Sequence, residues 1–204
     1  MAKAKPLTGL DPHAPTGINA RIAARERLKE MSNWERYVNN SANIQELHDL
    51  RIAAKRLRYT LEIFEDVLPE ACKPIVEELT KIQDELGALH DSDVRIALLR
   101  YCLSNRGKAA DFTPALSEVE NPQNQEQVKL EPQMVAKLMD LTTAPSDQER
   151  QGLEQLLAKE EQLREQQYTT FFQHWHQLQE RNFHQQILDA LDANKEKSDP
   201  KTQS

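Results

Sequence analysis

The chain has 204 residues and a formal net charge of −7, a length that suits one domain with a buried core. Glycine is scarce, with 5 residues, and aromatic residues make up only 5%, which disfavours a sheet and predicts an all-α protein. No apolar run follows the N-terminal lysines, and no stretch of about 18 apolar residues occurs, so we expect a cytoplasmic protein without a membrane segment. Cys72 and Cys102 form no CxxC pair and are expected to be ordinary thiols.

The charge is divided unevenly along the chain. The first 110 residues hold 17 lysines and arginines against 16 acidic residues, whereas the remaining residues hold 9 against 17. Because salt screens charges beyond roughly 10 Å, local clusters decide what the first half attracts. The negative total therefore does not exclude an anionic partner.

The first two elements follow from prolines and helical spacing. Residues 1–17 contain three prolines and are expected to be a disordered tail. A helix is predicted over 18–39, ending at the Asn39-Asn40-Ser41 turn. A second helix begins after Ser41 or Asn43 and runs to Leu68, because Pro69 prevents its continuation. Its apolar seam recurs at spacings of 3 and 4, and consists of Leu47, Leu50, Ala54, Leu57, Leu61 and Phe64.

The rest of the chain predicts two more long helices. The third opens near Pro74 and extends to Leu103. Residues 104–146 are rich in proline and polar residues and are expected to form a flexible insertion, with one short helix over 133–142. The fourth starts at the Ser146-Asp147 cap, and a last helical piece follows before a disordered tail at 194–204. The prediction is an antiparallel four-helix bundle over 18–193, with a long disordered linker between helices three and four.

A line of cationic side chains flanks the apolar seam of the second helix. It consists of His48, Arg51, Lys55 and Arg58, with Glu62 at its end and Arg56 close by. We call His48, Arg51, Lys55 and Arg58 the cationic stripe. Its members lie on one side of the helix over roughly 15 Å, long enough to face several phosphates of a linear chain. Arginine bonds phosphate oxygens in bidentate fashion, so the stripe indicates polyanion binding.

Two other interpretations of these residues stay open. Cations beside a seam commonly pair with acids on a neighbouring helix, which would make this a structural or adaptor protein. The histidines suggest a metal-binding protein using His48, His90, His174 and His184, although the spacing along the fourth helix is not the i, i+4 of known metal sites. RNA is a weaker candidate, because no aromatic residues alternate with the stripe to stack bases. No catalytic or nucleotide-binding motif is visible, so we expect neither an enzyme nor a cofactor.

Two strings carry a family resemblance. Residues 47–59 read LHDLRIAAKRLRY and residues 79–94 read LTKIQDELGALHDSDV. Their combination resembles the CHAD family, the conserved histidine α-helical domain. The resemblance implies a helical bundle that binds inorganic polyphosphate without catalysis and associates with polyphosphate granules. Carried onto matching positions, it assigns the binding residues His48, Arg51, Lys55, Arg56, Arg58 and Lys81, to which the second string adds His90.

The chain departs from the family in one respect. The family's common form has two pseudo-symmetric four-helix halves, whereas this sequence carries one copy of the motif. A symmetric dimer is the simplest way to supply the second half, so we expect a homodimer.

Overall fold

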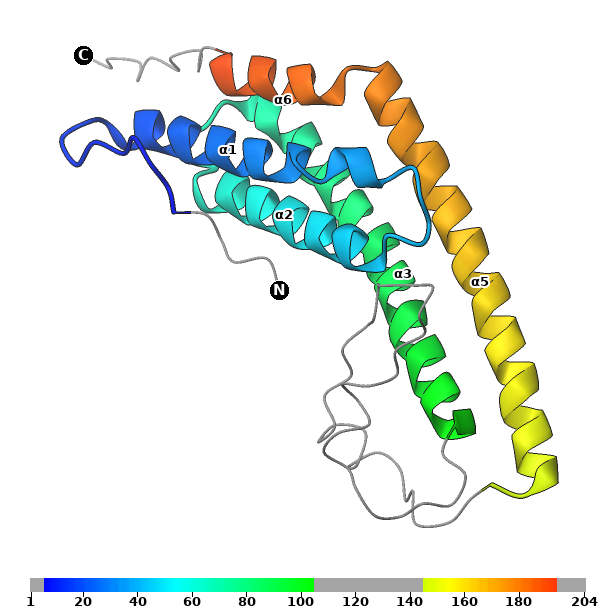
Figure 1. Cartoon of the computed structure of the whole chain (residues 1–204). Helices are drawn as coiled ribbons and strands as arrows, with labels where there is room; N and C mark the ends of the chain where they lie inside the picture. Colours follow the sequence, from blue (N-terminus) through cyan, green and yellow to red (C-terminus); the bar gives the residue numbers. More distant parts are fainter. Residues whose placement is uncertain (1–5, 105–144, 194–204) are drawn as a thin grey trace, which may run out of the picture. The chain divides into compact units, whose positions relative to one another are not determined.

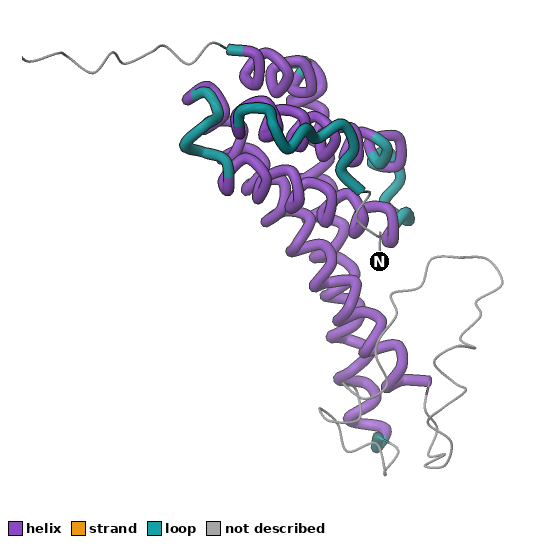
Figure 2. The backbone as a smooth tube through the Cα atoms, turned by 90° about the vertical axis from the view of Figure 1, so that its left-hand side faces the viewer, coloured by secondary structure: helices purple, strands orange, loops and turns teal. Residues whose placement is uncertain are grey.

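The computed structural model describes residues 6–104 and 145–193. Five α-helices lie in these residues (Figure 1): α1 Thr16–Ser32, α2 Ile44–Ile63, α3 Lys73–Ser104, α5 Asp147–Glu180 and α6 Phe183–Asp192. Two short 3-10 helices, η1 Glu35–Tyr37 and η2 Glu70–Cys72, precede α2 and α3. Figure 2 shows helices and loops, and no strand, in the described part of the chain. The all-α prediction is therefore confirmed, whereas the predicted linker, its short helix at 133–142 and the C-terminal tail lie outside the described residues.

The described residues form two compact units. Unit 1 comprises residues 6–36, 49–84 and 174–193, and unit 2 comprises residues 37–48, 85–104 and 145–173. The helices α2, α3 and α5 each give one part to either unit. No helix in the described ranges is long and apolar enough to cross a membrane.

Unit 1 is built around the apolar seam of α2. Leu50, Ala54, Leu57 and Leu61 are all buried, with exposed fractions of at most 2%, as helical spacing at 3 and 4 predicts. Side chains from the other helices close the core, and among them are Leu28, Met31, Leu79, Ile82, Leu178 and Ile187. The helix α6 contacts α1 and η2, and Arg21 Nε donates a 2.8 Å hydrogen bond to the Leu191 carbonyl at its end.

Two helix ends differ from the prediction. The first helix ends at Ser32 rather than at Asn39, because the Asn33 side-chain amide bonds the Lys29 carbonyl over 2.9 Å and so competes with the helical backbone. The second ends at Ile63 rather than at Leu68. Beyond Ile63 the chain continues in turns, in which Glu65 N–H bonds the Glu62 carbonyl over 3.2 Å and Val67 N–H bonds the Phe64 carbonyl over 3.0 Å.

The long fourth helix begins where its sequence predicts. At its start, Ser146 N–H donates to Glu149 Oε2 over 2.8 Å and Glu149 N–H donates to Ser146 Oγ over 3.4 Å, the reciprocal pattern of a capping box. At its end, Asn182 takes a left-handed conformation with φ of 53°, which asparagine tolerates better than most residues. This residue separates α5 from the predicted last helical piece, α6.

Unit 2 pairs the second half of α3 with the first part of α5 (Figure 1). The pairing is antiparallel, since positions that rise along α3 meet positions that fall along α5: Ser92 with Gln167, Asp93 with Arg164 and Arg95 with Glu160. The Arg164 guanidinium also donates to the Ser41 carbonyl over 2.6 Å. These polar contacts thus set the register of the two helices.

Candidate polyanion site

Three members of the cationic stripe lie in unit 1, on one side of α2. Arg51, Lys55 and Arg58 are separated by four and three residues, so they follow one another along the helix. Tyr59 lies beside them and is 42% exposed. Its ring centroid is 5.4 Å from Lys55 Nζ and 4.9 Å from Arg58 Cζ, which are cation–π distances. The tyrosine therefore holds two of the cations close to each other.

Carboxylates neutralise little of this surface. Arg58 pairs with Glu62 at 3.7 Å, with exposed side-chain fractions of 21% and 40%, so water screens the pair. Among residues 6–104 and 145–193, neither Arg51 nor Lys55 has a carboxylate within ion-pair distance. The Arg51 Nε is buried and has no hydrogen-bond partner there. The unit-1 part of the stripe thus keeps most of its positive charge.

Arg56 lies apart from the stripe. It lies two positions before Arg58, which places it about 200° from Arg58 around the helix axis. There its guanidinium pairs with Glu30 of α1, a carboxylate that is 4% exposed and also accepts a 2.8 Å bond from Arg27. The sequence motif counts Arg56 with the binding residues, whereas its geometry is that of a structural ion pair inside unit 1.

Lys81 extends the cationic surface onto α3. Arg58 Nη1 lies 3.4 Å from the hydroxyl of Thr80, the residue directly before Lys81. The Lys81 side chain is exposed and has no ion-pair partner in the described ranges. Lys81 is therefore one residue along α3 from the side chain that Arg58 contacts.

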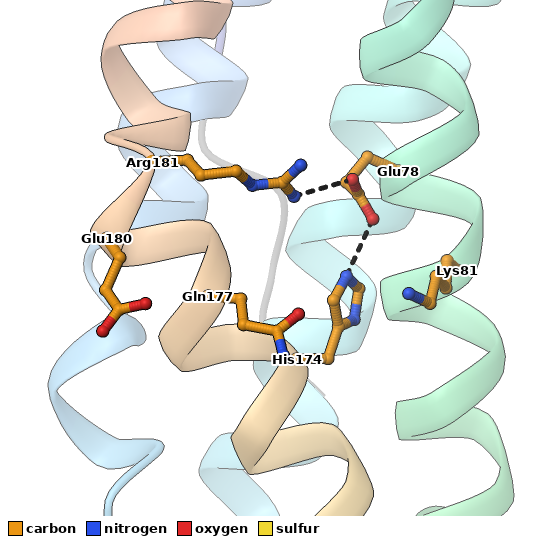
Figure 3. A pocket seen from close by; sticks show the side chains of 6 residues that line it. All are labelled: Glu78, Lys81, His174, Gln177, Glu180 and Arg181. Atoms are coloured by element: carbon orange, nitrogen blue, oxygen red, sulfur yellow. Dashed lines mark hydrogen bonds and ion pairs between the residues drawn. The ribbon is translucent and has the colours of Figure 1, made fainter.

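Beyond Lys81 the surface is hollowed. A pocket of about 370 Å³ is lined by Lys81 and Glu78 of α3 and by His174, Gln177, Glu180 and Arg181. Glu78 accepts from His174 Nε2 over 2.7 Å and from Arg181 Nη2 over 3.0 Å (Figure 3). Burial raises the pKa of Glu78, but the bonds from Arg181 and His174 outweigh it and hold the pKa below the usual 4.5.

The two motif histidines come together in unit 2. The ring centroids of His48 and His90 are 4.4 Å apart, with their planes tilted by 39°. His90 Nδ1 is buried and has no hydrogen-bond partner in the described part of the chain. The nearby Asp93 is 5% exposed and pairs with Arg164 at 2.5 Å. Burial raises the pKa of the Asp93 carboxyl, and Arg164 only partly opposes that rise.

The structure does not assemble the alternative metal site. Within residues 6–104 and 145–193, no three histidine, cysteine or acidic side chains gather as metal ligands would. His174 bonds Glu78, whereas His184 lines a separate pocket of about 170 Å³ with Trp175 and Phe183. The adaptor hypothesis requires the stripe to be paired internally, and within unit 1 only Arg58 has such a partner, at 3.7 Å.

Some residues of this region were missed by the sequence reasoning. His174, Gln177 and Arg181 follow one another at intervals of three and four residues, which places them on one face, and all three line the pocket. The role of Glu78 had no signal, because its position on α3 looks like any exposed acid. Tyr59 closes the first motif string, but its position over two cations depends on side-chain conformations that spacing does not give.

Comparison with known proteins agrees with the motif. The model of the CHAD domain matches residues 2–100. No curated protein and no solved structure matches this chain. The matched stretch contains every residue of the two motif strings, including His48, Lys81 and His90. The family resemblance of this chain, to the CHAD domain, is thereby confirmed over residues 2–100.

Proposed function

We propose that this protein binds inorganic polyphosphate through Arg51, Lys55, Arg58 and Lys81, and that it catalyses no reaction. The observation that carries the proposal is the lack of carboxylate partners for Arg51, Lys55 and Lys81 among the described residues. An unpaired cation gains more from a phosphate than one already neutralised by an acid. The match to the CHAD domain, a family that binds polyphosphate in general, supports the same ligand.

The spacing of these cations suits a linear polyanion. Arg51 and Arg58 are seven residues apart, which is roughly 10 Å along a helix. A chain of phosphates that follows α2 meets a guanidinium, an ammonium and a second guanidinium in turn. Arginine forks grip phosphate oxygens in bidentate fashion, and lysine adds a point charge. Because a polyanion has many such groups, several modest contacts add up to firm binding.

The Arg58–Glu62 pair does not oppose this role. At 3.7 Å and with 40% of the Glu62 side chain exposed, the pair is worth about 0–1 kcal/mol. A phosphate that approaches Arg58 replaces one weak contact by stronger ones. The chain's net charge of −7 acts mainly at long range, where salt screens it.

The motif also assigns His48 and His90 to the site. Both lie in unit 2, as a pair of neighbouring rings, and their part in binding remains a prediction of the motif. Replacing both histidines by glutamine, with polyphosphate titration as the readout, tests this assignment, and unchanged affinity would exclude the pair from the site.

The test is a calorimetric titration with long-chain polyphosphate at two salt concentrations. The variant carries Arg51→Gln, Lys55→Gln and Arg58→Gln. A control with the same charge change carries Lys29→Gln, Lys73→Gln and Lys159→Gln, three exposed lysines on other helices. Each lost phosphate contact lowers the slope of log K against log salt by about 0.7, as for a single-stranded polyanion, so the stripe variant should lose about 2.

The control variant should bind like the wild type apart from a small general charge effect. Circular dichroism must show unchanged helicity in both variants. If the stripe variant retains wild-type affinity and salt dependence, the proposed site is wrong. If zinc or nickel binds tightly and polyphosphate does not, the metal-binding alternative replaces it.

We further propose that two chains pair to supply the second half of the family's usual two-bundle form, and that the protein is located in the cytoplasm on polyphosphate granules. Light scattering at micromolar concentration tests the dimer, and a monomer there would reject it. Fluorescence microscopy of a tagged chain beside a polyphosphate stain tests the location.

A further inference from the structure

We propose that the pocket between α3 and the end of α5 is a second subsite for the same polyanion, in which Lys81 and Arg181 hold phosphate groups beyond those on α2. This inference rests on the proposed function. It adds Arg181, which lies outside residues 2–100 and is assigned by no family motif.

The pocket offers hydrogen-bond donors that no residue in the described ranges uses. The Arg181 side chain is 52% exposed and gives one N–H, on Nη2, to Glu78. A guanidinium has five N–H donors in a planar fork, and in the described ranges the other four of Arg181 have no partner. Lys81 and Gln177 line the same pocket. Figure 3 shows the Lys81 ammonium on α3 and the Arg181 guanidinium on the opposite side of the pocket.

The acidic residues of the pocket already have side-chain partners. Glu78 binds Arg181 and His174 through its two oxygens, and these bonds keep its pKa low although burial raises it. Figure 3 shows Glu180 on the opposite helix from Lys81, and its Oε1 lies 3.3 Å from His176 Nδ1. Glu78 therefore fixes the position of Arg181 and leaves the remainder of the guanidinium for an incoming anion.

The two subsites are continuous in unit 1. Arg58 reaches Thr80, and the next residue, Lys81, lines the pocket. A phosphate chain that leaves α2 at Arg58 therefore meets Lys81 and then Arg181. Helix axes in contact are about 8–10 Å apart, so this path runs across three helices and is longer than the stripe alone. A long linear polyanion can fill it, whereas a single phosphate cannot.

The test compares Arg181→Gln with Arg25→Gln. Arg25 is a matched control, because it is also in unit 1, is 41% exposed and has one ion pair, with Asp192. With long-chain polyphosphate, Arg181→Gln should weaken binding severalfold and lower the salt slope by about 0.7, while Arg25→Gln should bind like the wild type. Arg181→Lys keeps the positive charge and should retain the salt slope even if affinity falls.

The outcomes separate this inference from the proposed function. If Arg181→Gln and Arg25→Gln bind alike while the stripe variant loses binding, the pocket is not a subsite and the site on α2 stands. If the stripe variant binds like the wild type, both proposals are rejected. Loss of binding in Arg181→Lys equal to that in Arg181→Gln, with a lower melting temperature in both, would assign Arg181 a structural role and overturn the inference.

Discussion

Arg56 and Arg58 are two residues apart in the same motif, yet their surroundings predict opposite roles. Arg56 is 24% exposed and pairs with Glu30, which is 4% exposed. Arg58 is 21% exposed, but its partner Glu62 is 40% exposed and 3.7 Å away. We expect Arg56→Gln to destabilise the fold and to leave binding unchanged. Arg58→Gln should weaken binding and change the stability of the fold very little.

The loss of stability expected for Arg56→Gln depends on the partners that Glu30 keeps. Leaving a buried charge without any partner costs about 3–5 kcal/mol, but Glu30 keeps its 2.8 Å bond to Arg27. The loss is then that of one charge-assisted hydrogen bond, about 1.5–3 kcal/mol. For Arg58 the loss of an exposed pair is about 0–1 kcal/mol.

Urea unfolding followed by circular dichroism measures the difference. With a slope of roughly 2 kcal/mol per molar urea, Arg56→Gln should lower the midpoint by about 1 M and Arg58→Gln by much less. Titration with polyphosphate should give the opposite order of effects. If Arg56→Gln leaves the midpoint unchanged and weakens binding as much as Arg58→Gln, then Arg56 is a ligand and the geometric argument is wrong.

Three other outcomes are expected. Tyr59→Leu should weaken polyphosphate binding about two- to fivefold in calorimetry, because the ring no longer positions two cations. Arg164→Ala should lower the free energy of unfolding by about 3 kcal/mol in urea titrations, since it leaves Asp93 buried without its cation. The folded-state pKa of Glu78 lies below its usual value of 4.5. Its carboxylate therefore contributes fully to stability above about pH 4.5, and this contribution is lost as pH falls through the folded-state pKa. Glu78→Gln should flatten the acidic part of a profile of melting temperature against pH.

The helices were predictable because each carries a local signal. Spacings of 3 and 4 identified the seam of α2, and Leu50, Ala54 and Leu57 are fully buried. The Ser146 capping box marked the start of α5 within one residue. The end of α1 was not predictable from spacing, because Val38 continues the apolar rhythm past Asn33 although the helix has already stopped.

The site was only partly predictable, for a geometric reason. Spacing gives the angle of each side chain around its own helix and so grouped Arg51, Lys55 and Arg58. It does not give which neighbouring helix faces a given angle. Arg56 was therefore counted near the stripe, whereas α1 and its Glu30 occupy that side. Glu78 escaped notice because its importance comes from two partners about 100 residues away.

The distribution of carboxylates explains how a chain of net charge −7 can present a surface for an anion. In unit 1 the buried carboxylate of Glu30 pairs with Arg27 and Arg56. Glu78 is hydrogen-bonded to His174 Nε2 and to Arg181 Nη2. Glu30 and Glu78 are thus paired within the fold, whereas Arg51 and Lys55 on α2 and Lys81 on α3 have no carboxylate partner in the described ranges. Because Coulomb interactions between exposed groups fade within about 10 Å, a bound phosphate chain responds to those cations and hardly to the acidic residues elsewhere.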